Sequence, residues 1–194
     1  MTTRYSVWPW YSAIAGLLVL DQVTKFLVRR YLPLHDSIPL IGDDFLRLTH
    51  VQNPGIAFGV QILGPTPLLI FGWLAALVLV VYLYRLVRQH DPLRWPIMLF
   101  IAGAFGNSID RTLWNGYVTD FVDVDFPDFI MERFAVFNVA DSCITIGIVL
   151  LLIIVFFNRD RLEPAASETH DRIPSPPSDS LPSDHRSGAA TPTD

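Results

Sequence analysis

The chain has 194 residues, of which 51% are hydrophobic and 17% are charged, and its mean hydropathy is positive at +0.38. This composition excludes an ordinary soluble domain and is typical of a small integral membrane protein. Residues 160–194 contain seven acidic residues and three arginines, so this segment supplies −4 of the net charge of −5. We therefore expect no nucleic-acid partner, because the rest of the chain lacks a basic patch.

Four apolar segments approach or exceed the length of about 20 residues that crosses a bilayer as a helix. They predict spanning helices at about residues 8–32, 67–86, 95–114 and 137–157. The first segment is too long for a signal peptide and lacks a small-residue cleavage site, so we expect it to remain as a helix. The predicted fold is an all-α integral membrane protein with outer loops at 33–66 and 115–136.

An even number of spans places both termini on one side of the membrane. Several arginines flank that side, namely Arg4, Arg85, Arg88, Arg94, Arg159 and Arg161. The positive-inside rule makes this side cytoplasmic, although Arg29, Arg30, Arg47 and Arg133 fall on the opposite side. We therefore expect cytoplasmic termini and outer loops that face away from the cytoplasm.

The first outer loop has the pattern of a small extracytoplasmic β-sheet element. Residues 38–41 and 45–51 are predicted as short strands, and Asn53, Pro54 and Gly55 form a turn signal. Residues 159–194 are rich in Pro, Ser, Asp and Thr and poor in large apolar residues. This composition predicts a disordered, acidic cytoplasmic tail.

Two aspartates at the ends of the last two apolar segments are the main candidates for chemistry. Asp120 lies just beyond the third segment and Asp141 lies at the start of the fourth, so one short loop keeps them on the same side of the bilayer. Ionisable groups at membrane depth mark functional sites, and two carboxylates that share a proton are what an aspartic protease requires. Spacing alone cannot choose between Asp120 and Asp123.

Other polar residues near these ends allow both a structural and a functional interpretation. Asp21 and Lys25 share a helix face, either as an interfacial ion pair or as a support for the site. Asn138 is either the N-cap of the fourth helix or part of the site. Asn107, Asp110 and Arg111 lie together at the end of the third segment, where we interpret Asp110 as the member of a structural ion pair, either with Arg111 or between helices.

Small residues and the cysteine content complete the list of candidates. Gly103 and Gly106 allow another helix or a substrate backbone to approach closely. The single cysteine, Cys143, excludes an intrachain disulfide, and we interpret it as a packing residue. The sequence has no metal-ligand cluster of His and Cys, so we expect no metal.

Five motifs, in this order along the chain, resemble those of lipoprotein signal peptidases, the type II signal peptidases of bacteria. They are DQVTK at 21–25, NPGIAFG at 53–59, GAFGNSIDR at 103–111, VTDF at 118–121 and FNVAD at 137–141. Each motif is weak alone, but all five together are specific. The resemblance covers residues 8–158 and leaves the tail outside.

The resemblance implies that Asp120 and Asp141 are the catalytic pair, which selects Asp120 over Asp123. It also implies supporting or substrate-binding roles for Asp21, Lys25, Asn53, Gly55, Gly103, Asn107, Arg111 and Asn138. The implied reaction is water-mediated cleavage of a prolipoprotein just before a cysteine that carries diacylglycerol, without a metal or organic cofactor. It further implies a monomer in contact with lipids of the bacterial cytoplasmic (inner) membrane, an active site at the outer face, and sensitivity to globomycin-type inhibitors.

Two other classes of function remain as alternatives. A proton-coupled transporter or channel would use carboxylates as a relay, but its acids would be distributed across the membrane thickness. A catalytically inactive homologue that binds lipoproteins would not need both aspartates. The sequence therefore favours an aspartic endopeptidase.

Overall fold

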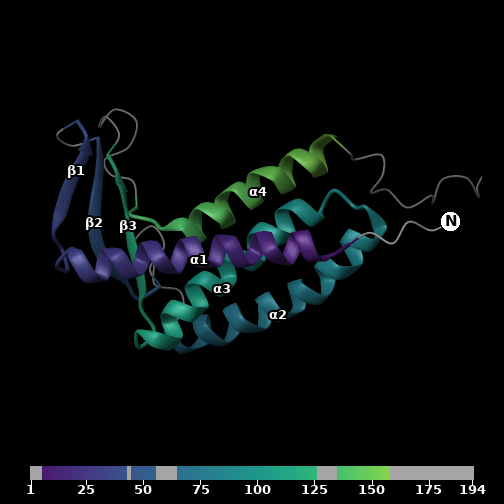
Figure 1. Cartoon of the computed structure of the whole chain (residues 1–194), viewed down its shortest axis with the longest axis horizontal. Coiled ribbons are helices and arrows are strands. Elements are labelled where there is room, and N and C mark those ends of the chain that lie inside the picture. Colours follow the sequence, from purple (N-terminus) through teal and green to yellow (C-terminus); the bar gives the residue numbers. More distant parts are fainter. Residues whose placement is uncertain (1–5, 43–44, 56–64, 126–134, 158–194) are drawn as a thin grey trace, which may run out of the picture. The chain divides into compact units, whose positions relative to one another are not determined.

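The computed structural model describes residues 6–42, 45–55, 65–125 and 135–157. Within these ranges lie the helices α1 (Trp8–Tyr31), α2 (Pro65–Gln89), α3 (Arg94–Leu113) and α4 (Val139–Phe157), and the strands β1 (Ser37–Ile41), β2 (Leu46–Asn53) and β3 (Val118–Val124). The sheet stands at the end of the helices where α1 ends and α4 begins (Figure 1). The predicted tail at 159–194 and residues 56–59 of the second motif lie outside the described residues.

Three helices in the described part of the chain are long and apolar enough to cross a membrane: Trp8–Tyr31, Thr66–Gln89 and Val139–Phe157. The fourth predicted span is present as helix α3, but it does not reach this level of apolarity. Its second half carries Asn107, Asp110 and Arg111, of which Asn107 and Asp110 are buried by other elements. The chain therefore has the helices of a multi-pass membrane protein, with one helix that is more polar than its neighbours.

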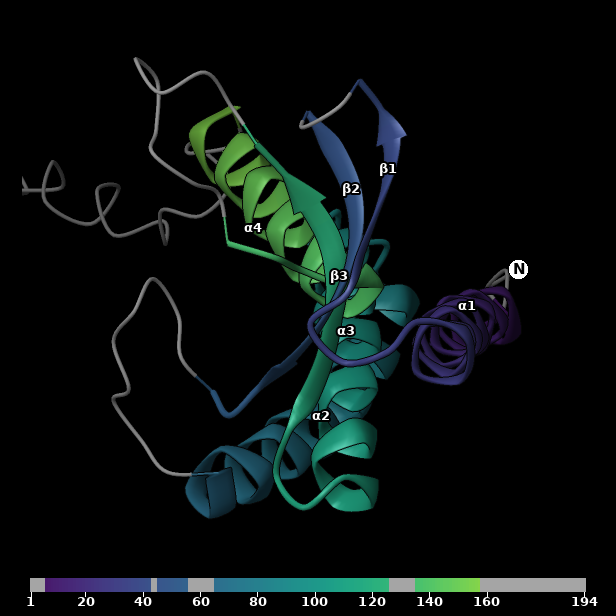
Figure 2. The same cartoon turned by 90° about the vertical axis from the view of Figure 1, so that its left-hand side faces the viewer.

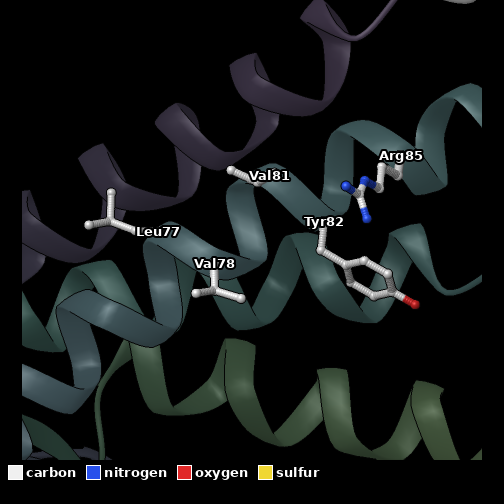
Figure 3. A pocket seen from close by; sticks show the side chains of 5 residues that line it. All are labelled: Leu77, Val78, Val81, Tyr82 and Arg85. Carbon is white, nitrogen blue, oxygen red and sulfur yellow. The ribbon is translucent and has the colours of Figure 1, made fainter.

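Apolar side chains cover the outer face of α2, as expected for a surface in contact with lipid. Leu77, Val78 and Val81 are each more than half exposed. With Tyr82 and Arg85 they line a shallow groove with a volume of about 460 Å³, and all five side chains come from this one helix (Figure 3). No carboxylate lines the groove, so the chemistry of the two aspartates lies elsewhere.

Helix α3 packs against each of the other three helices. Its contact with α4 is close because Gly103 and Gly106 have no side chains. A Cβ atom on Gly103 would lie 2.6 Å from the carbonyl oxygen of Ala140, and one on Gly106 would lie 2.7 Å from Asp21 Oδ2. These two glycines thus bring α3, the start of α4 and the middle of α1 together, as the small-residue pattern predicted.

The two predicted strands are present as β1 and β2, but the sheet has a third strand that the sequence interpretation missed. The order is β1-β2-β3, with both pairs antiparallel (Figure 2). Strand β3 comes from residues 115–136, the second predicted outer loop, so the prediction of a small sheet element in the first outer loop is confirmed for β1 and β2 but is incomplete. Most of β3 is buried, and it lacks the alternation of exposed and buried residues that marks a half-exposed strand.

Candidate active site

Strand β3 and the first turn of α4 bring Asp120 and Asp141 to the same residue, Asn138. The Asn138 side-chain amide donates to Asp120 Oδ1 at 2.7 Å, and its backbone N–H donates to Asp141 Oδ2 at 3.2 Å. In return, the Asp141 backbone N–H donates to Asn138 Oδ1 at 2.9 Å. This reciprocal pairing caps α4 in the manner of a capping box. Asn138 therefore both caps the helix and connects the two carboxyl groups.

Two further asparagines hold the remaining sides of the carboxyl groups. Asn53, at the end of β2, donates to Asp120 Oδ2 at 3.0 Å, and Asn107, on α3, donates to Asp141 Oδ1 at 2.8 Å. The Asn53 side chain is fixed in turn because its Oδ1 accepts the backbone N–H of Gly55 at 2.8 Å. Gly55 has a φ of +102°, and a Cβ atom there would collide with Leu68, so this turn requires glycine.

Lys25 fixes the orientation of Asn107. Its ammonium group is fully buried and lies 2.9 Å from Asp21 Oδ2 and 3.0 Å from Asn107 Oδ1. Because an ammonium group can only donate, it holds the amide oxygen of Asn107 and leaves the amide nitrogen to face Asp141. Asp21 Oδ1 accepts the backbone N–H of Ala140 at 2.9 Å. The Asp21–Lys25 pair is therefore a buried support for the start of α4 and not an exposed interfacial ion pair.

The surroundings of Asp120 favour its protonated form near neutral pH. Burial, and to a lesser extent the negative charge of Asp141, raises the pKa of Asp120 to about 7. The hydrogen bonds from Asn53 and Asn138 and the charge of Lys25 oppose this increase. A carboxyl group that keeps its proton beside a second carboxylate has the properties of a general acid paired with a general base.

Arg111 lies beside these carboxyl groups and has an incompletely satisfied side chain. It is partly buried, and its Nε has no hydrogen-bond partner in the described part of the chain. The charges of Asp141, Asp120 and Asp110 all act on it. The Arg111 guanidinium therefore supplies positive charge near the two aspartates. Its Nε–H has no acceptor among the described residues.

Asp123, the alternative to Asp120, lies in a different set of contacts. The Thr49 hydroxyl donates to Asp123 Oδ2 at 2.7 Å, and the Arg47 guanidinium lies 3.3 Å from the same oxygen. These contacts belong to the sheet and do not include Asp141. Of the two aspartates that spacing could not separate, the structure places Asp120 with Asp141.

Three residues around Asp120 were not among the predicted site residues. Asp110 is fully buried and pairs with Arg29 at 3.2 Å, and both residues hold Thr119, which precedes Asp120. The sequence contained a signal for Arg29, because positions 21, 25 and 29 repeat every four residues and share one helix face.

In the described residues no group of three or more His, Cys, Asp or Glu side chains could hold a metal ion.

A family model and the sequences of known proteins both match this chain, and they indicate the same family. The family described as "Signal peptidase (SPase) II" matches residues 13–157. The lipoprotein signal peptidase of Brevibacillus brevis is 38% identical over 156 residues, which covers 77% of this chain and 96% of the relative. That of Treponema pallidum is 36% identical over 185 residues and covers 86% and 95%.

A solved structure described as a bacterial membrane enzyme, at 2.3 Å resolution, is also similar. It has a TM-score of 0.67 and 29% identity, and the match covers 84% of this chain and 96% of that one. A second such structure has a TM-score of 0.63 and 30% identity, with coverage of 80% and 97%. The family match at residues 13–157 includes both Asp120 and Asp141. The chain therefore belongs to the signal peptidase II family of membrane proteases.

Proposed function

We propose that this protein is an aspartic endopeptidase that removes signal peptides from diacylglyceryl-modified prolipoproteins, with Asp120 and Asp141 as its catalytic dyad. The observation that supports this most strongly is the bonding of both carboxyl groups to the same residue, Asn138. The membership in the signal peptidase II family and the name of its relatives, lipoprotein signal peptidase, support the substrate class.

The roles of the two aspartates follow from their surroundings. Asp120, whose pKa is raised to about 7, is the protonated member and donates a hydrogen bond to the scissile carbonyl oxygen. Asp141, as the carboxylate, takes a proton from a water molecule whose oxygen attacks the carbonyl carbon. The tetrahedral intermediate then collapses: the carbon–nitrogen bond breaks, and the proton held by Asp141 passes to the leaving amine. The reaction needs no metal or organic cofactor.

The remaining site residues serve the substrate and the dyad. Asn53, Asn107 and Asn138 hold the carboxyl groups, and the guanidinium of Arg111 supplies positive charge for the peptide backbone of the substrate. Gly103 lets α4 pack closely against α3, and Gly55 lets Leu68 pack against the turn that holds Asn53. Lys25 and Asp21 hold Asn107 and the start of α4 in place.

A site at the membrane surface suits a lipid-modified substrate, because the two acyl chains stay in the bilayer while the peptide bond meets water. We place four spans, with α3 as the more polar one, in the bacterial cytoplasmic (inner) membrane. We propose that both termini face the cytoplasm and that the dyad faces outward. The protein works as a monomer in contact with membrane lipids, and globomycin-type inhibitors block it.

The test is cleavage by the purified protein of one prolipoprotein in two forms, with and without diacylglycerol on the cysteine. We expect cleavage of the lipid-modified form only, immediately before the modified cysteine, and inhibition by globomycin. Binding without cleavage would support an inactive lipoprotein-binding homologue. Proton flux across proteoliposomes without any cleavage would support the transporter alternative.

A further inference from the structure

We propose that Thr119 is a positioning residue for the reaction, held by Arg29 and Asp110 so that the next residue, Asp120, faces Asp141. This inference rests on the proposed function of the dyad. It concerns three residues that have no part in the chemistry itself. Their role is to fix the short strand that carries one of the two catalytic carboxyl groups.

Every polar atom of Thr119 is held by a different element. Its backbone N–H donates to Asp110 Oδ2 of α3 at 2.8 Å, and its hydroxyl oxygen accepts from Arg29 Nη1 of α1 at 2.8 Å. Its carbonyl oxygen accepts a longer bond of 3.4 Å from Asn138, which precedes α4. Thr119 is 1% exposed, so no solvent replaces these partners. Two helices and the residue before a third thus hold Thr119, in addition to its pairing with Gln52 of β2.

The two groups that hold Thr119 are themselves rigidly placed. Asp110 is completely buried, and Arg29 Nη1 lies 3.2 and 3.3 Å from its two oxygens. The guanidinium of Arg29 also lies over the ring of Trp114, 4.6 Å from its centroid. Lys25 adds a second positive charge 3.8 Å from Asp110 Oδ2. Asp110 is therefore more than one half of an ion pair, because it also accepts a hydrogen bond from the strand that carries Asp120.

The arrangement has a consequence for catalysis that simple stabilisation of the fold would not have. The Cα atoms of Thr119 and Asp120 are joined by one peptide unit, so a displaced Thr119 moves Asp120 away from Asn53 and Asn138. Catalytic groups must be held within about 0.5 Å of their productive positions, and an error of about 1 Å can cost 100-fold in rate. Substrate binding is affected less, because Thr119 is buried beneath the site.

The decisive variant is Thr119→Val, which has nearly the same shape and lacks only the hydroxyl that Arg29 holds. We expect kcat to fall by about 10-fold to 100-fold while KM changes less than about twofold. Thr119→Ser, which restores the hydroxyl, should recover most of the rate. The matched control is Thr112→Val on α3. It also removes a bonded hydroxyl, which donates to the Ser108 carbonyl and accepts from Trp73, and neither of these partners belongs to β3.

Thermal unfolding, followed by the reaction of the buried thiol of Cys143 with a maleimide dye, reports whether each variant is folded. If Thr119→Val does not fold, Arg29→Lys gives the second test, because it keeps a positive charge near Asp110 and loses the geometry of the guanidinium. The inference is overturned if folded variants keep the wild-type kcat, or if only KM rises. In that case wild type would still cleave and Asp120→Asn would still be inactive, so the proposed function would stand. Failure of wild type to cleave would overturn both.

Discussion

Asp120→Asn should make the stability of the protein less dependent on pH. In the folded protein, burial and the charge of Asp141 raise the pKa of Asp120 from 3.8 to about 7. The folded state therefore binds more protons than the unfolded state between these values. Because the folded state binds more protons than the unfolded state, the free energy of unfolding of the wild type falls as the pH rises from about 4 to about 7. An asparagine at position 120 does not titrate, so the variant lacks this loss of stability.

The size of the effect follows from the shift. Each pH unit between the unfolded and folded pKa values changes the free energy of unfolding by about 1.4 kcal/mol. From pH 5 to pH 8 the carboxyl group of Asp120 thus costs the wild type about 3 kcal/mol relative to the variant, because the loss ends near pH 7. For a protein of this size, this corresponds to a difference of about 5–10 °C in Tm.

A second effect of the substitution does not depend on pH. Asn53 and Asn138 both donate to Asp120, and an asparagine there presents its own amide nitrogen to one of them. This mismatch costs about 1–3 kcal/mol at every pH. The informative quantity is therefore the difference in Tm between variant and wild type as a function of pH, and not its value at one pH.

The assay is thermal unfolding of both proteins in the same detergent at pH 5, 6, 7 and 8, followed by the fluorescence of the five tryptophans. The other titrating groups are common to the two proteins and cancel in the difference, apart from Asp141, whose charge is coupled to that of Asp120. We expect the Tm of the variant to rise relative to wild type between pH 5 and pH 7 and then to level off. A difference that stays constant across this range would refute the raised pKa of Asp120.

Three further predictions concern the supports of the site. Asn53→Ala removes a hydrogen bond that lowers the pKa of Asp120, so this pKa should rise further; the fall of kcat/KM at alkaline pH should then move to higher pH, and a limb that moves to lower pH would contradict the assignment. Lys25→Met leaves the buried carboxylate of Asp21 without its cation, while Asp110 keeps Arg29, and should cost about 3–5 kcal/mol, seen as a large loss of Tm. Gly55→Ala forces an L residue to a φ of +102° against Leu68 and should reduce kcat/KM while the helices remain folded, as circular dichroism would show.

The helices could be predicted from the sequence because each depends on a long local run of apolar residues. The predicted spans at 8–32 and 137–157 agree with α1 and α4 to within about two residues. Strand β3 could not be predicted in the same way. Its burial comes from pairing with β2, which is more than 60 residues away in the chain, and from α1 and α3. Aspartates at positions 120 and 123 within a short segment resemble a polar loop until those partners are known.

The two candidate aspartates could be identified from their positions at the ends of apolar segments, but their surroundings could not. Asp110 and Arg29 are 81 positions apart, and nothing in the local sequence indicates that both hold Thr119. Of the two ion pairs that the sequence allowed for Asp110, with Arg111 or between helices, the structure has the interhelical one, with Arg29 of α1. Its bond to the Thr119 N–H depends on strand β3, which the sequence did not predict.

The most direct test of the dyad is cleavage of a diacylglyceryl-modified prolipoprotein by wild type and by Asp120→Asn, Asp141→Asn and Asp123→Asn. The last variant is the matched control, because it neutralises a carboxylate of the same strand that Arg47 and Thr49 hold away from Asp141. We expect the first two variants to lose at least about 1,000-fold in kcat while they remain folded, and the control to keep cleaving. Cleavage at the wild-type rate by folded Asp120→Asn or Asp141→Asn would contradict the dyad.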